Sequence, residues 1–128
     1  MAHEITWNTP RRVLQLKLSN NLSLEEFIEI DRQITERLQE CDERIALIVD
    51  ASDATFSPYS IERVKPTQKY LNSYQIVQLI VVGDKKLNRL VMMLLFNLCR
   101  PRLQFCDNFD QAKRYISMTN VQTGCSTV

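Results

Sequence analysis

The stretch RIALIVD, residues 44–50, decides the fold class of this chain. It is short, almost continuously apolar and rich in Ile and Val, which is typical of a central strand covered on both faces. A second stretch of this kind, QIVQLIVV at residues 75–82, is closed by Gly83 and Asp84. Two buried strands predict a sheet that lies between helical layers.

Two more strands are predicted before and after this pair. Residues 12–19 read RVLQLKLS, in which Leu14, Leu16 and Leu18 alternate with polar residues, the period of a half-buried strand. Residues 4–8 are expected to pair with it as a hairpin, and Asn20-Asn21 to end the strand. Residues 103–106 form a further short strand, so the sheet has four to five strands.

Four helices are predicted between and after the strands. The first begins with a capping box at Ser23 and Glu26 and ends near residue 41. The second runs from about Ser60 to Tyr70 or Leu71, with Pro66 as an internal break. The third covers residues 86–99. The fourth is capped by Asp107-Asn108 and has a buried stripe of Phe109, Ala112, Tyr115 and Ile116.

Strands that alternate with helices in this way indicate parallel crossovers. The predicted fold class is therefore α/β, with a mixed, mostly parallel sheet flanked by about four helices. Residues 1–118 are expected to form one domain, because a chain of 128 residues leaves little room for a second core. Residues 119–128 are small and polar and are expected to form a flexible tail.

The element order and the segment IVDASDATF, residues 48–56, resemble the STAS superfamily of sulfate-transporter and anti-sigma factor antagonist domains. In that family a strand ending in Asp-x-Ser leads to a helix that starts at Asp-Ser-Ser-Gly. Asp50 and Ser52 match the first element, whereas Pro58, Tyr59 and Ile61 replace the Asp, the first Ser and the Gly of the second. The resemblance implies a STAS-like fold and a non-catalytic regulatory domain that binds another protein.

A phosphorylated Ser at the helix start acts as a switch in the anti-sigma antagonists, and by resemblance that position falls on Ser60, with Ser57 beside it. A phosphate there would suit the helix dipole and repel an acidic partner. Ser60 is also a good helix cap without any phosphate. Asp50, Ser52 and Asp53 form an acidic loop at a strand end, where α/β folds bind ligands; as turn residues they would instead close backbone hydrogen bonds.

The third helix is apolar on nearly all sides. One face is expected to cover the sheet and to turn the other face outward; it consists of Leu87, Leu90, Val91, Leu94, Leu95 and Leu98. That face is a candidate interface for a homodimer or another protein, formed by Met92, Met93, Phe96 and Cys99. Intramolecular burial and a peripheral lipid contact are the alternatives.

Composition excludes several function classes. The net charge is +1, which argues against nucleic acid as a partner, although residues 1–60 hold 6 basic and 11 acidic side chains and residues 61–128 hold 10 and 4. The sequence contains no run of about 20 apolar residues, so no transmembrane segment is predicted. The four cysteines form no C-x-x-C pair and the single histidine, His3, is expected in a mobile terminus, so no metal, cofactor or catalytic site is predicted.

The sequence therefore predicts a cytoplasmic, non-catalytic protein-interaction or regulatory domain that also associates with itself as a homodimer. The alternative is a domain that binds a small molecule or lipid in an apolar pocket between helix and sheet. An enzyme is the third possibility. It is disfavoured because the acids and nucleophiles of this sequence do not cluster at a productive spacing.

Overall fold

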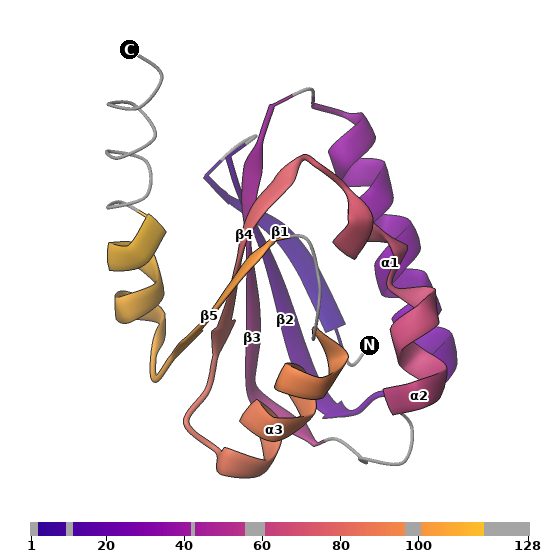
Figure 1. Ribbon diagram of the computed structural model, residues 1–128, viewed down its shortest axis with the longest axis vertical. Helices are drawn as coiled ribbons and strands as arrows, with labels where there is room; N and C mark the ends of the chain where they lie inside the picture. Colours follow the sequence, from indigo (N-terminus) through magenta and orange to yellow (C-terminus); the bar gives the residue numbers. More distant parts are fainter. Residues whose placement is uncertain (1–2, 10–11, 42, 56–60, 97–100, 117–128) are drawn as a thin grey trace.

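The structure is a computed structural model that describes residues 3–9, 12–41, 43–55, 61–96 and 101–116. These residues form a five-stranded sheet in the order β1-β2-β3-β4-β5 (Figure 1). β1 (His3–Thr9) is antiparallel to β2 (Val13–Asn21), whereas β3 (Ile45–Thr55), β4 (Ile76–Val82) and β5 (Arg102–Cys106) continue the sheet in parallel. The predicted mixed sheet and its N-terminal hairpin are confirmed.

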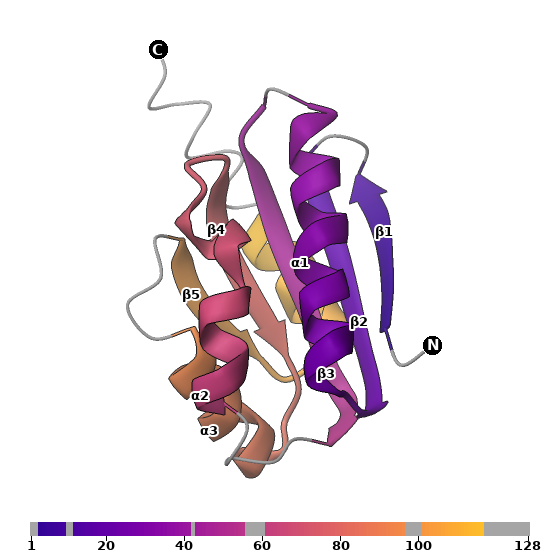
Figure 2. The same ribbon diagram turned by 90° about the vertical axis from the view of Figure 1, so that its right-hand side faces the viewer.

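Helices cover both faces of the sheet. α1 (Leu24–Gln39), α2 (Ile61–Val64) and α3 (Lys86–Leu95) pack on one face, and the helical residues 109–116 pack on the other (Figures 1 and 2). Leu47 and Val49 belong to the core under the three helices, whereas Ile48 belongs to the smaller core under residues 109–116. Successive residues of β3 thus face different layers, which is why RIALIVD is apolar almost throughout.

Both ends of α1 are held by side chains. The Ser23 hydroxyl accepts from the Glu26 amide at 3.2 Å, as the capping box predicts. At the other end, the Gln75 side-chain amide donates to the carbonyls of Leu38 at 2.9 Å and Cys41 at 2.7 Å. These carbonyls lie where a helix leaves its acceptors unsatisfied, so Gln75 ties the end of α1 to the start of β4.

β3 is longer than predicted, because residues 52–55 continue the strand instead of forming a loop. After an irregularity in register, Ser19, Asn20 and Asn21 of β2 pair with Asp53, Ala54 and Thr55. β2 ends at Asn21, as the Asn20-Asn21 pair predicts, but both residues still belong to the strand, and Asn20 has a φ of 56°. The polar composition of both segments concealed a backbone pairing that satisfies their amides and carbonyls.

The predicted second helix is divided into short pieces. α2 is followed by two 3-10 turns, η2 (Lys65–Thr67) and η3 (Lys69–Asn72). Pro66 stands at the start of η2, where its missing N–H costs least. Tyr70 and Leu71 are buried, so the segment still packs as one side of the helical layer.

The last described helix begins as predicted. The Asn108 side-chain oxygen Oδ1 accepts from the Gln111 amide at 3.0 Å, and the Gln111 side-chain oxygen accepts from the Asp107 amide at 3.0 Å. The first bond is the predicted cap by Asn108, and the second satisfies the amide of the residue before it. Ala112 and Ile116 are buried against the sheet, with Phe109 and Tyr115 packed beside them. The predicted tail at residues 119–128 lies outside the described residues.

Candidate functional site

The carboxyl ends of the parallel strands lie together at one end of the sheet, which is the usual position of ligand sites in α/β folds. Asp50 lies there, and its carboxylate accepts from the Ser52 amide at 3.1 Å and from the Ser52 hydroxyl at 2.6 Å. Asp53, one residue on, is exposed within β3. The Asp50 carboxylate thus closes the irregular section of β3. This agrees with the interpretation of these residues as turn formers that close local hydrogen bonds.

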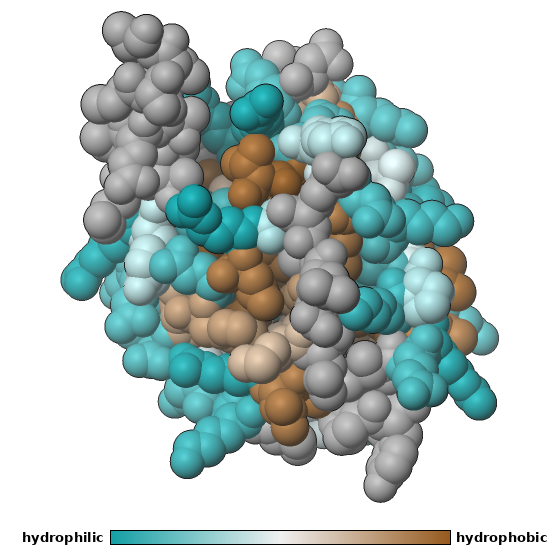
Figure 3. Space-filling view, in the orientation of Figure 1, coloured by the Kyte–Doolittle hydropathy of each residue, from teal (hydrophilic) through white to brown (hydrophobic). Residues whose placement is uncertain are grey.

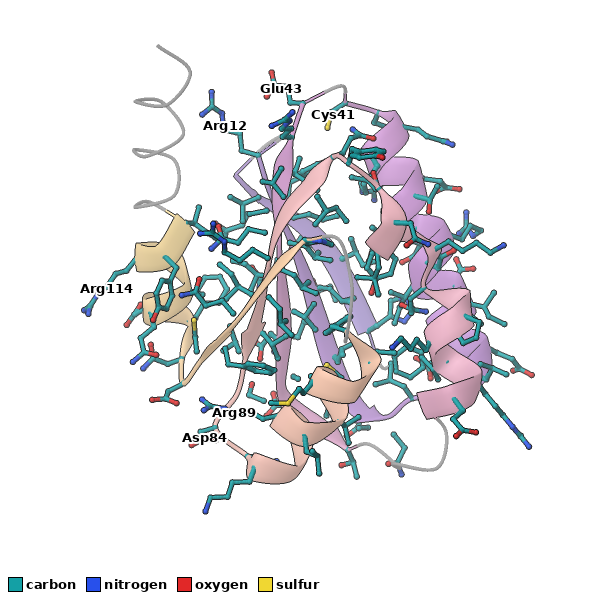
Figure 4. All side chains as sticks on the ribbon, viewed as in Figure 1. Arg12, Cys41, Glu43, Asp84, Arg89 and Arg114 are labelled. Carbon is teal, nitrogen blue, oxygen red and sulfur yellow. The ribbon has the colours of Figure 1, made fainter. Side chains whose placement is uncertain are left out.

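Arg89 of α3 lies at the same end of the sheet (Figure 4). Its Nε donates to the Gly83 carbonyl at 2.7 Å, and its guanidinium pairs with the Asp107 carboxylate. The Gly83 amide donates in turn to the Cys106 carbonyl at 3.0 Å. Arg89 therefore holds α3 against the segments that follow β4 and β5, which is a structural use of its charge.

Gly83 has a φ of +151° at this point, a conformation that L side chains rarely adopt. An added Cβ would lie 3.6 Å from the Ser52 amide nitrogen and 3.7 Å from the Ala51 carbonyl carbon. Space alone would allow a methyl group, so the backbone conformation is the reason for a glycine here. Next to it, burial raises the pKa of the Cys106 thiol, which disfavours the reactive thiolate.

The orientation predicted for α3 was wrong for two of the proposed interface residues. Met92 is 0% exposed and Phe96 is 2% exposed, and both belong to the larger core. Val91 and Leu95 are buried with them. Met93 is exposed as predicted, and Cys99 lies outside the described residues.

Two apolar side chains of α3 point to solvent instead, Leu90 at 52% and Met93 at 51% exposure. Lys85 and Lys86 are exposed at the start of the same helix. We name these four residues, with Arg89, the α3 surface. Figure 3 shows hydrophobic atoms gathered on this side of the molecule, over β5 and α3.

β5 adds a second feature to this side of the molecule. It is the last strand in the sheet order, and no strand of the described ranges pairs with its outer edge. Its side chains Leu103 and Phe105 are partly buried against the larger core. A strand edge that no described strand pairs with, and exposed apolar side chains on a helix, are each typical of a surface that another chain can cover.

His3 is the residue whose place was predicted least well. It is 7% exposed, within β1 and under α1, and not in a mobile terminus. Its Nδ1 lies 3.4 Å from a Glu26 carboxylate oxygen and its Nε2 lies 3.1 Å from the Gln33 side-chain oxygen. These partners are an acid and an amide, so the contacts fasten β1 to α1 and assemble no nucleophile and base. The signal available in the sequence was the spacing of two residues, which places His3 on the same strand face as Ile5 and Trp7.

The other predicted positions are placed as follows. Ser57 and Ser60, the candidate phosphorylation residues, lie outside the described residues. Within the ranges that the structure describes, no three His, Cys, Asp or Glu residues are arranged to hold a metal ion. In those same ranges no helix has the length and apolar character required to cross a membrane.

The structure resembles that of an uncharacterized protein from the DUF3478 family with a SpoIIAA-like fold, from Shewanella loihica PV-4. The TM-score is 0.64 over 90% of this chain and 92% of that chain, at 13% sequence identity. No protein-family model and no curated protein matches the sequence. At this identity the likeness concerns the fold alone. The chain therefore has a SpoIIAA-like fold, the one that the resemblance to STAS domains implied.

Proposed function

We propose that this chain is a non-catalytic, regulatory protein-binding domain that docks its partner on the α3 surface and also associates with itself. The observation that carries the docking site is the half-exposed pair Leu90 and Met93 on one short helix. The same helix reaches the end of β5, the last strand in the sheet order, through the pair of Arg89 with Asp107. Covering the exposed half of each would contribute about 1 kcal/mol, since full burial of such a side chain contributes about 1.5–3 kcal/mol.

The charges around the pair favour an acidic partner. Lys85 and Lys86 are exposed, and Arg89 adds a partly neutralised positive charge through its pair with Asp107. Basic groups at the rim of an interface mainly raise the rate of association and select the partner, while the apolar centre supplies affinity. Met93 suits this role because an unbranched thioether adapts to different surfaces.

Three polar groups of the described residues that could support catalysis have structural partners. Asp50 is bonded to Ser52, Arg89 to Gly83 and Asp107, and His3 to Glu26 and Gln33. These bonds support a binding role over an enzymatic one. Ser60 and Ser57 stay the proposed phosphorylation positions, and a cytoplasmic location stays a proposal, which the free, buried thiols of Cys41 and Cys106 favour.

The test is a comparative capture experiment from a lysate of the source organism. The bait is the wild type, the double variant Leu90→Asp/Met93→Asp, or the control Tyr74→Asp. Tyr74 is 74% exposed and precedes β4, at the opposite end of that strand from α3. A partner retained by the wild type and the control and lost with the double variant is expected. Equal retention by all three baits would exclude the α3 surface as the docking site.

A further inference from the structure

The helical layer carries two strips of opposite charge. The first strip is α1 with Glu40, in which six acidic side chains outnumber Arg32 and Arg37. Glu25, Glu36 and Glu40 of this acidic strip are exposed; Glu36 pairs with Arg32 and Glu40 with Arg37, so the strip keeps four acids in excess of its two arginines. The second is α2 with η2 and η3, where one acid, Glu62, faces three bases: Arg63, Lys65 and Lys69. All four of these charged residues of the basic strip are exposed.

The two strips lie side by side in the fold (Figure 2). The Gln68 side-chain amide donates to the Phe27 carbonyl at 2.9 Å, and the Tyr70 amide donates to the Asp31 carboxylate at 3.0 Å. These bonds fix the side of α1 that faces the basic strip. The boundary between the strips is therefore a defined line on the surface of the helical layer.

Exposed apolar side chains lie along this boundary. Leu24 and Ile28 are 39% and 50% exposed. They precede Asp31 at spacings of seven and three residues, which places all three on one side of the helix. Because Asp31 bonds to Tyr70, that side is the one that faces the basic strip. The layer thus presents acid, apolar residues and base in sequence across its surface.

We propose, building on the self-association included in the proposed function, that a second copy of this chain covers the helical layer about a two-fold axis along the boundary. Such an axis sets the acidic strip of each copy against the basic strip of the other, so both contacts are attractive. Leu24 and Ile28 of the two copies meet at the centre. A standard interface takes about 800 Å² from each partner, a modest part of the 7833 Å² surface of one chain.

The charges select a second copy over an unrelated protein. A partner for this layer must present base opposite acid twice, with apolar side chains between. A second copy of the layer, rotated by a half-turn about the boundary between the strips, has that arrangement. The α3 surface carries one sign of charge on its exposed lysines and lacks this self-complementarity. The two surfaces therefore serve different partners.

The test is a charge exchange followed by sedimentation velocity. One variant reverses the acidic strip, Glu25→Lys/Glu36→Lys, and the other reverses the basic strip, Arg63→Glu/Lys69→Glu. Each alone sets like charges together at both contacts, and its dimer is expected to weaken at least about tenfold. Mixed in equal amounts, the variants form heterodimers in which both contacts are attractive again. Lys113→Glu/Arg114→Glu, on the opposite face of the sheet, is the control and should remain dimeric.

Several outcomes would overturn this assignment. A wild type that stays monomeric at high concentration in about 0.1 M salt, where surface charges are only partly screened, excludes self-association altogether. A dimer that persists in both reversed variants places the interface elsewhere, and so does a mixture that fails to form heterodimers although both variants keep native circular dichroism. Loss of the dimer only in Leu90→Asp/Met93→Asp would move the self-contact to the α3 surface. None of these results changes the capture experiment with other proteins.

Discussion

Met92→Ala and Met93→Ala alter adjacent residues of one type, so the pair measures how α3 is rotated about its axis. Met92 is fully buried in the larger core, whereas half of the Met93 side chain faces solvent. Truncating a buried methionine to alanine costs about 2–5 kcal/mol, because transfer energy and a cavity term add. Met93 leaves no enclosed cavity and should lose about 1 kcal/mol or less, half of an ordinary burial term.

Urea unfolding at constant temperature, followed by circular dichroism, measures both values. We expect the free energy of unfolding to fall by at least about 2 kcal/mol in Met92→Ala, with little change in Met93→Ala and equal denaturant slopes. The single tryptophan, Trp7, provides a second probe, because it packs against the larger core. Equal losses, or a larger loss for Met93→Ala, would contradict the rotation of α3 that buries Met92 and exposes Met93.

The remaining predictions concern a cap, a backbone conformation, a charge pair and a ligand. Ser23→Ala removes the acceptor for the Glu26 amide and should cost about 1 kcal/mol, measured by thermal unfolding. Gly83→Ala should also destabilise, by about 1–2 kcal/mol, because its φ is +151°; an unchanged melting temperature would contradict this. A hydrogen bond from Arg32 lowers the pKa of Glu29 below its ordinary 4.5, so this pair stabilises the fold above that pH and is lost as pH falls through the folded-state pKa. Arg32→Gln should return the Glu29 titration, followed by NMR, toward 4.5. Native mass spectrometry should give multiples of the 15.0 kDa chain without adducts, whereas a tightly held apolar ligand would favour the small-molecule or lipid alternative.

The parts of the fold that followed from sequence are those with a strong local signal. The alternation of Leu14, Leu16 and Leu18 predicted β2, and the continuous apolar run at 45–49 predicted a strand covered on both faces. The cap residues Ser23 and Asn108 marked the starts of two helices, because their side chains satisfy amides that a helix leaves free. Each of these signals acts within one element and needs no tertiary contact.

The errors arose where a distant element decides the outcome. α3 is apolar around most of its circumference, so its periodicity has no polar face to fix the rotation. Packing against the rest of the core buries Met92 and Phe96 and leaves Leu90 outside. Likewise, residues 53–55 look like a loop until they pair with β2.

His3 is an error of the same kind. One histidine near the start of a chain has no pattern of its own, and its burial depends on acceptors that α1 supplies 23 and 30 residues later. The candidate site shares this difficulty. The chemistry of Asp50 and Arg89 was visible as residue types, whereas their pairing with Ser52, Gly83 and Asp107 depended on the strand ends coming together.

The most direct test of the account is the affinity of a purified, captured partner for the wild type and for Met93→Asp, measured by isothermal titration calorimetry. Placing a charge at the centre of an apolar contact should weaken binding at least about tenfold, which corresponds to about 1.4 kcal/mol. The melting temperature should stay near that of the wild type, because Met93 is half-exposed. A dissociation constant within about twofold of the wild type, in a folded variant, would contradict the claim that this domain works by binding a protein on its α3 surface.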